Sequence, residues 1–149
     1  MKVILTILFF CLIMASSTCY AINCTVSTGS MHFPPYNFLS LGKVDSTTNI
    51  SVFCDQSTPF AVKLSAGNSQ GDFFQRRLIS TETQTPLFYN LYLDSSHSQI
   101  WGEGTASTLF YQGTAGNVPI NIPVFGRILP RQNVRPGQYQ DSVVITVEW

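Results

Sequence analysis

Short stretches in which apolar and polar residues alternate dominate the chain from residue 22 onward, and turn-forming residues separate them. Alternation with a period of two indicates β-strands with one buried face, and helical periodicity is nearly absent. The candidate core-facing sets are Thr48-Ile50-Val52-Cys54, Phe60-Val62-Leu64, Leu87-Tyr89-Leu91-Leu93, Val118-Ile120-Ile122-Val124 and Val143-Ile145-Val147-Trp149. Short strands divided by turns predict a sandwich or a barrel, and the length fits one immunoglobulin-like β-sandwich domain.

Two prolines interrupt one of these sets. Pro119 and Pro123 alternate with the apolar residues between Val118 and Val124. Proline has no backbone N–H to donate to a sheet ladder. We therefore expect this strand to lie at a sheet edge or to bend there.

The last predicted strand is among the most regular in the chain, and the sequence ends with it at Trp149. A regular apolar strand at a sheet edge is an aggregation hazard that proteins usually blunt, yet Glu148 is the only charge after Val144. One interpretation is an ordinary edge strand. The other, which we favour, is an incomplete sandwich whose missing neighbour comes from another chain.

The N-terminus has the pattern of a secretory signal peptide. Lys2 is followed by an apolar run from Val3 to Ala15 and then by a polar stretch that ends at Ala21. The run is shorter than the roughly 20 apolar residues that a membrane span needs. We therefore expect cleavage after Ala21, which divides the chain into a signal peptide (1–21) and a secreted domain (22–149) with no membrane span.

Cleavage would remove Cys11 and Cys19 and leave Cys24 and Cys54. Two cysteines in an exported chain predict one disulfide, whose loop closure should stabilise the fold by roughly 3.5 kcal/mol. A reactive or metal-binding pair is the alternative, but no supporting His or Cys lies nearby in sequence. Removing Lys2 from eight basic residues leaves seven against eight acidic ones, so charge gives no reason to expect nucleic acid as a partner.

The sequence offers little chemistry, so we expect no enzyme activity, no catalytic residues, no cofactor and no metal site. Asp94-Ser95-Ser96-His97 holds triad residue types, but consecutive residues in a loop predict a polar turn. Arg127 and Asp141 are either a cross-strand ion pair or two solvated charges. Four aromatic residues are candidates either for a carbohydrate-binding surface or for the core: Tyr92, Trp101, Phe110 and Tyr111.

Several segments, in this order and spacing, give the chain a family resemblance. They are Cys24-Thr25-Val26-Ser27, Asn49-Ile50-Ser51-Val52-Phe53-Cys54, Leu64-Ser65-Ala66-Gly67, Tyr89-Asn90-Leu91-Tyr92-Leu93-Asp94, Trp101-Gly102-Glu103-Gly104, Val124-Phe125-Gly126-Arg127 and the run from Gly137 to Val147. Together they resemble the spore coat protein U domain, which is shared with subunits of archaic (Csu-type) chaperone–usher pili.

The resemblance implies a secreted structural or adhesive subunit that passes through the periplasm to the cell surface, in a pilus or a spore coat. Its partners would be a periplasmic chaperone, an outer-membrane usher and other subunits. The sandwich would lack its final strand, which the chaperone or a neighbouring subunit supplies. By position, Val143, Ile145, Val147 and Trp149 would border the strand-acceptor groove and contact the chaperone.

The sequence departs from the pilus-subunit pattern at its N-terminus, where only Ile22 and Asn23 precede Cys24 after the predicted cleavage. We therefore expect a subunit that accepts a strand but does not donate one, as at the end of a fibre or in a coat. The alternative function is a self-sufficient secreted β-sandwich that binds a ligand such as carbohydrate.

Overall fold

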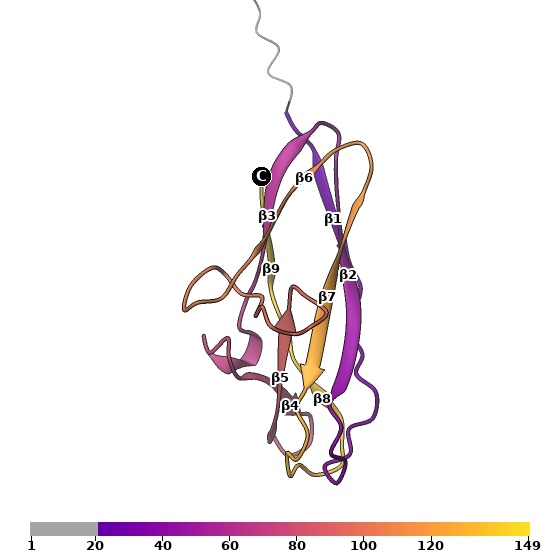
Figure 1. Cartoon of the computed structure of the whole chain (residues 1–149), viewed down its shortest axis with the longest axis vertical. Coiled ribbons are helices and arrows are strands. Elements are labelled where there is room, and N and C mark those ends of the chain that lie inside the picture. Colours follow the sequence, from indigo (N-terminus) through magenta and orange to yellow (C-terminus); the bar gives the residue numbers. More distant parts are fainter. Residues whose placement is uncertain (1–20) are drawn as a thin grey trace, which may run out of the picture.

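The computed structural model describes residues 21–149, which form an all-β domain (Figure 1). The predicted signal peptide lies outside the described residues, except for Ala21. The elements are β1 (Cys24–Thr28), β2 (Val44–Cys54), β3 (Thr58–Leu64), the 3₁₀ turn η1 (Gly67–Ser69), β4 (Arg76–Ser80), β5 (Pro86–Tyr92), β6 (Tyr111–Ala115), β7 (Ile120–Ile128), β8 (Tyr139–Gln140) and β9 (Ile145–Glu148).

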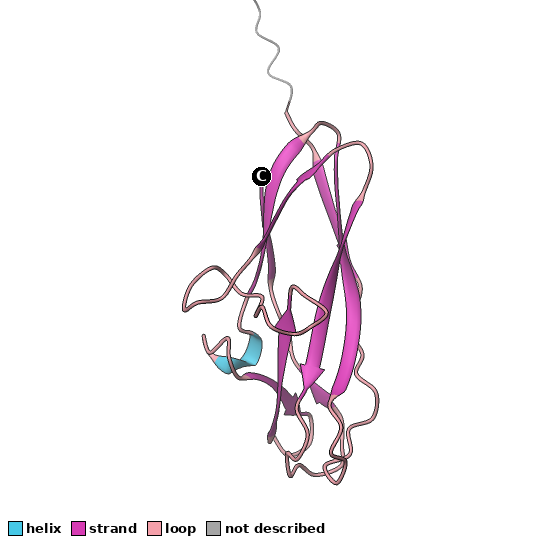
Figure 2. Ribbon diagram, viewed as in Figure 1, coloured by secondary structure: helices cyan, strands magenta, loops and turns pink. Residues whose placement is uncertain are grey.

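The strands form two sheets of unequal size (Figure 2). The larger sheet has the order β1-β2-β7-β5-β4-β8, and the smaller has the order β6-β3-β9. Every strand pairing in both sheets is antiparallel. The fold is therefore a β-sandwich, as the alternation of the sequence predicts.

The core lies between the facing sides of the two sheets. Its fully buried side chains include Ile50 and Val52 of β2, Val62 of β3 and Ile128 of β7. Most of the predicted core-facing residues are confirmed, because burial alternates along β2, β3, β5 and β7. Val118 is an exception: it precedes β7, and 69% of its surface is exposed.

The predicted edge position of the proline-containing strand is wrong, because β7 lies between β2 and β5. Pro123 is nevertheless accommodated. It pairs with Asn49 of β2, whereas β5 pairs only with the stretch from Phe125 to Ile128. At Pro123 the strand therefore has a paired neighbour on one side only, so its missing N–H removes no ladder hydrogen bond to β5.

The predicted disulfide is confirmed. Cys24 and Cys54 are opposite each other in the β1–β2 register, and their sulfur atoms are 2.03 Å apart. Cys54 is fully buried. The bond therefore ties the edge strand β1 to the core at the end of the sandwich where β2 turns into β3.

A buried arginine, Arg76 of β4, ties the larger sheet to two loops. Its guanidinium donates to the carbonyl oxygens of Ser65 and Trp101 and to Oδ1 of Asn90, at 2.6–3.2 Å. Burial lowers the pKa of Arg76 from its usual value. Sequence patterns place arginine on the surface, so this tie was not predicted.

Candidate functional site

Strand β9 has an open edge. Within residues 21–149 it pairs with β3 and with no other strand. Ser65 N–H donates to the carbonyl of Val144, so the backbone groups of Val144 face β3. In an antiparallel ladder, the backbone groups of successive residues face the partner strand and away from it in turn. By that alternation the amides of Thr146 and Glu148 face β3, whereas those of Ile145 and Val147 face away from it.

Strand β1 has a second open edge, because its one paired neighbour among the described strands is β2. Gly29 N–H donates to the carbonyl of Asn49. The same alternation turns the backbone groups of Val26 and Thr28 away from β2. Two edges with unpaired backbone groups therefore border the space between the sheets.

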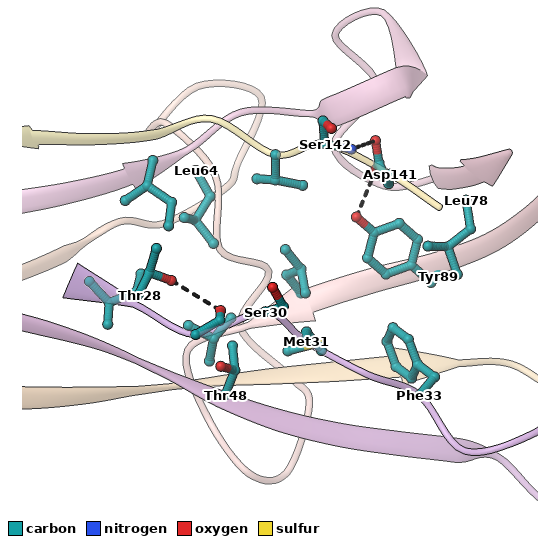
Figure 3. Close-up of a pocket in the computed structure, with 16 residues that line it drawn as sticks. Thr28, Ser30, Met31, Phe33, Thr48, Leu64, Leu78, Tyr89, Asp141 and Ser142 are labelled. Carbon is teal, nitrogen blue, oxygen red and sulfur yellow. Dashed lines mark hydrogen bonds between the residues drawn. The ribbon is translucent and has the colours of Figure 1, made fainter. Parts of the chain in front are cut away.

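A groove of about 350 Å³ lies between these two edges. One wall is formed by residues after β1 and the other by residues leading into β9, and the floor belongs to the core (Figure 3). Its lining residues are Thr28, Gly29, Ser30, Met31, Phe33, Thr48, Ile50, Leu64, Leu78, Tyr89, Leu91, Val124, Asp141, Ser142, Val143 and Ile145. The groove is therefore an apolar trough with a few polar groups.

Of the four residues predicted to border an acceptor groove, Val143 and Ile145 line this one. Val147 packs partly buried against the core on the same side of β9. Trp149 follows β9, and 57% of its surface is exposed. The structure thus places the four along one edge, and their role in contacting a partner stays a prediction.

Core-facing side chains at the disulfide end of this edge pair are uncovered. Val26 is opposite the fully buried Val52 in the register and therefore faces the core side, yet 40% of its surface is exposed. An apolar side chain on a core face is normally covered by the opposing layer. Here neither sheet supplies that cover.

The wall after β1 was missed by sequence analysis. Met31 and Phe33 cross the core side of β7 at Gly126, where an added Cβ would lie 2.3 Å from the Met31 sulfur and 2.8 Å from Cζ of Phe33. Phe33 also packs edge-on against Tyr89, with ring centroids 5.9 Å apart. The sequence feature that could have indicated this contact is Gly126 in Val124-Phe125-Gly126-Arg127, because a glycine leaves room for Met31 and Phe33.

Asp141 lies in the opposite wall of the groove. Its carboxylate accepts hydrogen bonds from the Tyr89 hydroxyl at 2.7 Å and from Ser142 N–H at 2.7 Å (Figure 3). It also accepts one from Asn68 N–H at 2.8 Å. Burial, together with the bond to Asp141, raises the pKa of Tyr89 far above its usual value. Tyr89 is therefore a neutral donor at every ordinary pH.

The suggested pairing of Arg127 with Asp141 is wrong. Arg127 instead forms a bidentate pair with Asp45 of β2, with both distances 2.6 Å, on the outer face of the larger sheet. The hydrogen bonds and charge of Arg127 lower the pKa of Asp45. The two strands β2 and β7 place these residues directly opposite each other, a register that the sequence did not reveal.

Asp94 and Trp101, two further candidates from the sequence, have structural roles in the fold. The Asp94 carboxylate accepts hydrogen bonds from Ser98 and from Gln99 N–H, which confirms a polar turn. Trp101 is fully buried and donates from its indole nitrogen to the Val62 carbonyl at 3.0 Å. Trp101 is therefore a core residue and is not part of an aromatic sugar-binding surface.

Residues 21–149 contain no group of three or more His, Cys, Asp or Glu side chains placed to hold a metal ion. No helix in the same range has the length and apolar character that a membrane crossing requires.

Several known proteins are similar to this chain. Protein U of Myxococcus xanthus is 28% identical over 106 residues, which cover 68% of this chain and 58% of Protein U. A chain in the crystal structure of the CsuC–CsuE chaperone–tip adhesion subunit pre-assembly complex, from archaic chaperone–usher Csu pili of Acinetobacter baumannii, matches with a TM-score of 0.62 at 25% identity. That match covers 87% of this chain and 40% of the other.

The chain thus spans less than two thirds of each of these relatives. The match to a family model is more extensive: the model of the Spore Coat Protein U domain matches residues 11–146. The matched range runs from before β1 to the first half of β9 and so includes residues of both edges of the groove. The chain belongs to the Spore Coat Protein U domain family.

Proposed function

We propose that this chain is a secreted structural or adhesive subunit of a bacterial surface assembly, a pilus or a spore coat. Residues 1–21 would be its signal peptide and residues 22–149 its mature domain. A β-strand from a second chain would complete the sandwich. The observation that carries the proposal is that two open sheet edges, β1 and β9, flank one apolar groove.

A strand in the groove would satisfy both edges. Its backbone can pair with the outward amides of Ile145 and Val147 on one side and with the groups near Val26 on the other. Its inward side chains would cover the exposed core side of Val26. Each large apolar side chain buried in this way contributes about 1.5–3 kcal/mol. Strand addition of this kind takes affinity from the backbone and register from the side-chain pockets.

The family and its relatives support a periplasmic chaperone or a neighbouring subunit as the donor of the strand. The similar solved structure contains a chaperone bound to a tip adhesion subunit. We therefore assign to this chain a periplasmic chaperone as first partner, an outer-membrane usher in transit and a neighbouring subunit at the cell surface. The proposal gives the chain no catalytic role.

The proposal is tested by adding short strand peptides to the purified, disulfide-bonded domain and following its thermal unfolding. A peptide of about six residues with alternating apolar side chains matches the usual length of a strand. At a peptide concentration of 100 times Kd, the domain should gain about 2.7 kcal/mol and its Tm should rise accordingly. The same peptide with a central proline should have little effect, because it cannot complete the ladders.

Two lysine variants of β1 provide a matched control. Val26→Lys places a charge on the groove side of the edge, and Thr25→Lys places it on the outer face of the same strand. The peptide should raise the Tm of Thr25→Lys as it does that of the unaltered domain, and should fail with Val26→Lys. If alternating apolar peptides leave the Tm of the unaltered domain unchanged, the proposed function is wrong.

A further inference from the structure

The groove has a distinct electrostatic character. Among the described residues that line it, Asp141 is the one acidic or basic residue. The others are apolar residues, glycine, hydroxyl-bearing residues and Tyr89, which is neutral. A strand that enters the groove therefore meets a negative charge at a fixed place and apolar walls elsewhere.

Asp141 is held in one orientation. Two backbone N–H groups and the Tyr89 hydroxyl bind its two oxygens, as described above. Gly67 gives it room: an added Cβ there would lie 2.3 Å from one carboxylate oxygen, and the φ of +60° at Gly67 also suits glycine. A carboxylate can accept about four hydrogen bonds, so the three present leave capacity for about one more donor.

The opposite end of the groove edge has a different chemistry. Val26 and Trp149, both partly exposed, lie toward the disulfide end, where β2 turns into β3. Asp141 lies at the other end, before β9 begins. A strand would therefore meet apolar surface at one end and a carboxylate at the other, which is enough to distinguish registers and directions.

We propose that Asp141 is a specificity-determining residue of the groove: it selects strands that place a lysine or arginine at the Asp141 end and rejects strands that place an acidic residue there. The occupant is a partner's β-strand with apolar alternation and one basic residue at that end. The physical basis is charge complementarity in a partly buried site, where solvent screens charges weakly and a like charge is costly. The inference rests on the proposed function.

The test uses peptides that are identical except at one terminal position, which is lysine, glutamine or glutamate. Because the direction of the strand is not assumed, one series varies the first residue and the other varies the last. Binding of each peptide to the purified, disulfide-bonded domain is measured by fluorescence anisotropy. In one of the two series the lysine peptide should bind at least about tenfold more tightly than the glutamate peptide.

Two protein variants separate a local effect from overall charge. Asp141→Asn keeps the size of the side chain but removes its charge, and should reduce the lysine preference to within about twofold. Glu82→Gln removes one negative charge from an exposed turn and should keep the preference in full. Equal affinity for the three peptides, or a preference that persists in Asp141→Asn, overturns the inference.

The outcomes distinguish this inference from the function on which it rests. If the glutamine peptide binds and charge makes no difference in either series, the groove accepts strands but Asp141 does not select them. If no peptide of either series binds, both proposals fail. Should Asp141→Asn not fold, the peptide series with the unaltered domain still decides, because equal affinities there contradict the proposal.

Discussion

Replacing Arg76 with methionine is expected to lower the free energy of unfolding by about 3 kcal/mol. The guanidinium is fully buried and bonds to three acceptors from separate parts of the chain: the carbonyls of Ser65 and Trp101 and the side chain of Asn90. Methionine has a similar length but no donors. The carbonyls of Ser65 and Trp101 would lose their partner, whereas Oδ1 of Asn90 would keep the hydrogen bond from Leu91 N–H. Each buried group left without a partner costs about 1–3 kcal/mol.

Removing a buried charge offsets part of this loss, which is why the expected value lies below the largest sum for the two carbonyls. The neighbouring residue supplies a matched control. Arg77 of β4 pairs with Phe88 in the register, and its guanidinium lies over that ring at 5.8 Å. Arg77→Met should therefore cost less than about 1 kcal/mol. Urea unfolding, with equal m-values for the variants, measures both changes in the free energy of unfolding. If Arg76→Met and Arg77→Met lose the same amount, the buried hydrogen bonds of Arg76 are unimportant for stability.

Removing the disulfide should have an effect of similar size. The double variant Cys24→Ala with Cys54→Ala is expected to lose about 3.5 kcal/mol, because the bond closes a loop over a sequence separation of 30 residues. The bond also holds β1, which has a paired neighbour on one side only among the described strands. The variant should therefore lose stability and, at temperatures where it is still folded, strand binding as well.

The control for the cysteine variant uses the same two strands. Ser27 and Ser51 are opposite each other in the same register, on the outer face. Changing both to alanine should alter the free energy of unfolding by less than about 0.5 kcal/mol per site. Reduction of the unaltered domain should reproduce the loss of the cysteine variant. If urea unfolding of reduced and oxidised domains gives the same midpoint, the disulfide does not stabilise this fold.

The strands and their buried faces could be predicted because alternation is a local property. Val52 and Val62 are on core faces because they are on the apolar side of the alternation. The disulfide could be predicted by counting the cysteines of a chain that was expected to be exported. The position of β7 could not be predicted from its prolines alone. Whether Pro123 is tolerated depends on how far β5 extends along β7, and that length is set by tertiary pairing.

The open edge near Ile145 could be predicted in outline, but the far wall of the groove could not. Met31 and Phe33 belong to an irregular segment without alternation, and their place depends on a contact with Gly126 about 95 residues away. The same holds for Asp141, whose partners Tyr89 and Asn68 come from distant parts of the chain. Long-range side-chain partners carry no periodic signal, so sequence patterns do not reveal them.

Amide hydrogen exchange along β9 tests most directly whether the outer edge of this strand is unpaired and can accept another strand. In the free domain, Ile145 and Val147 should exchange quickly, whereas Thr146 and Glu148, whose amides face β3, should exchange more slowly. A bound strand peptide should slow Ile145 and Val147 by about 100-fold or more, because their amides then enter a ladder. If Ile145 and Val147 are already as protected in the free domain as Thr146, the edge is not open and the account is contradicted.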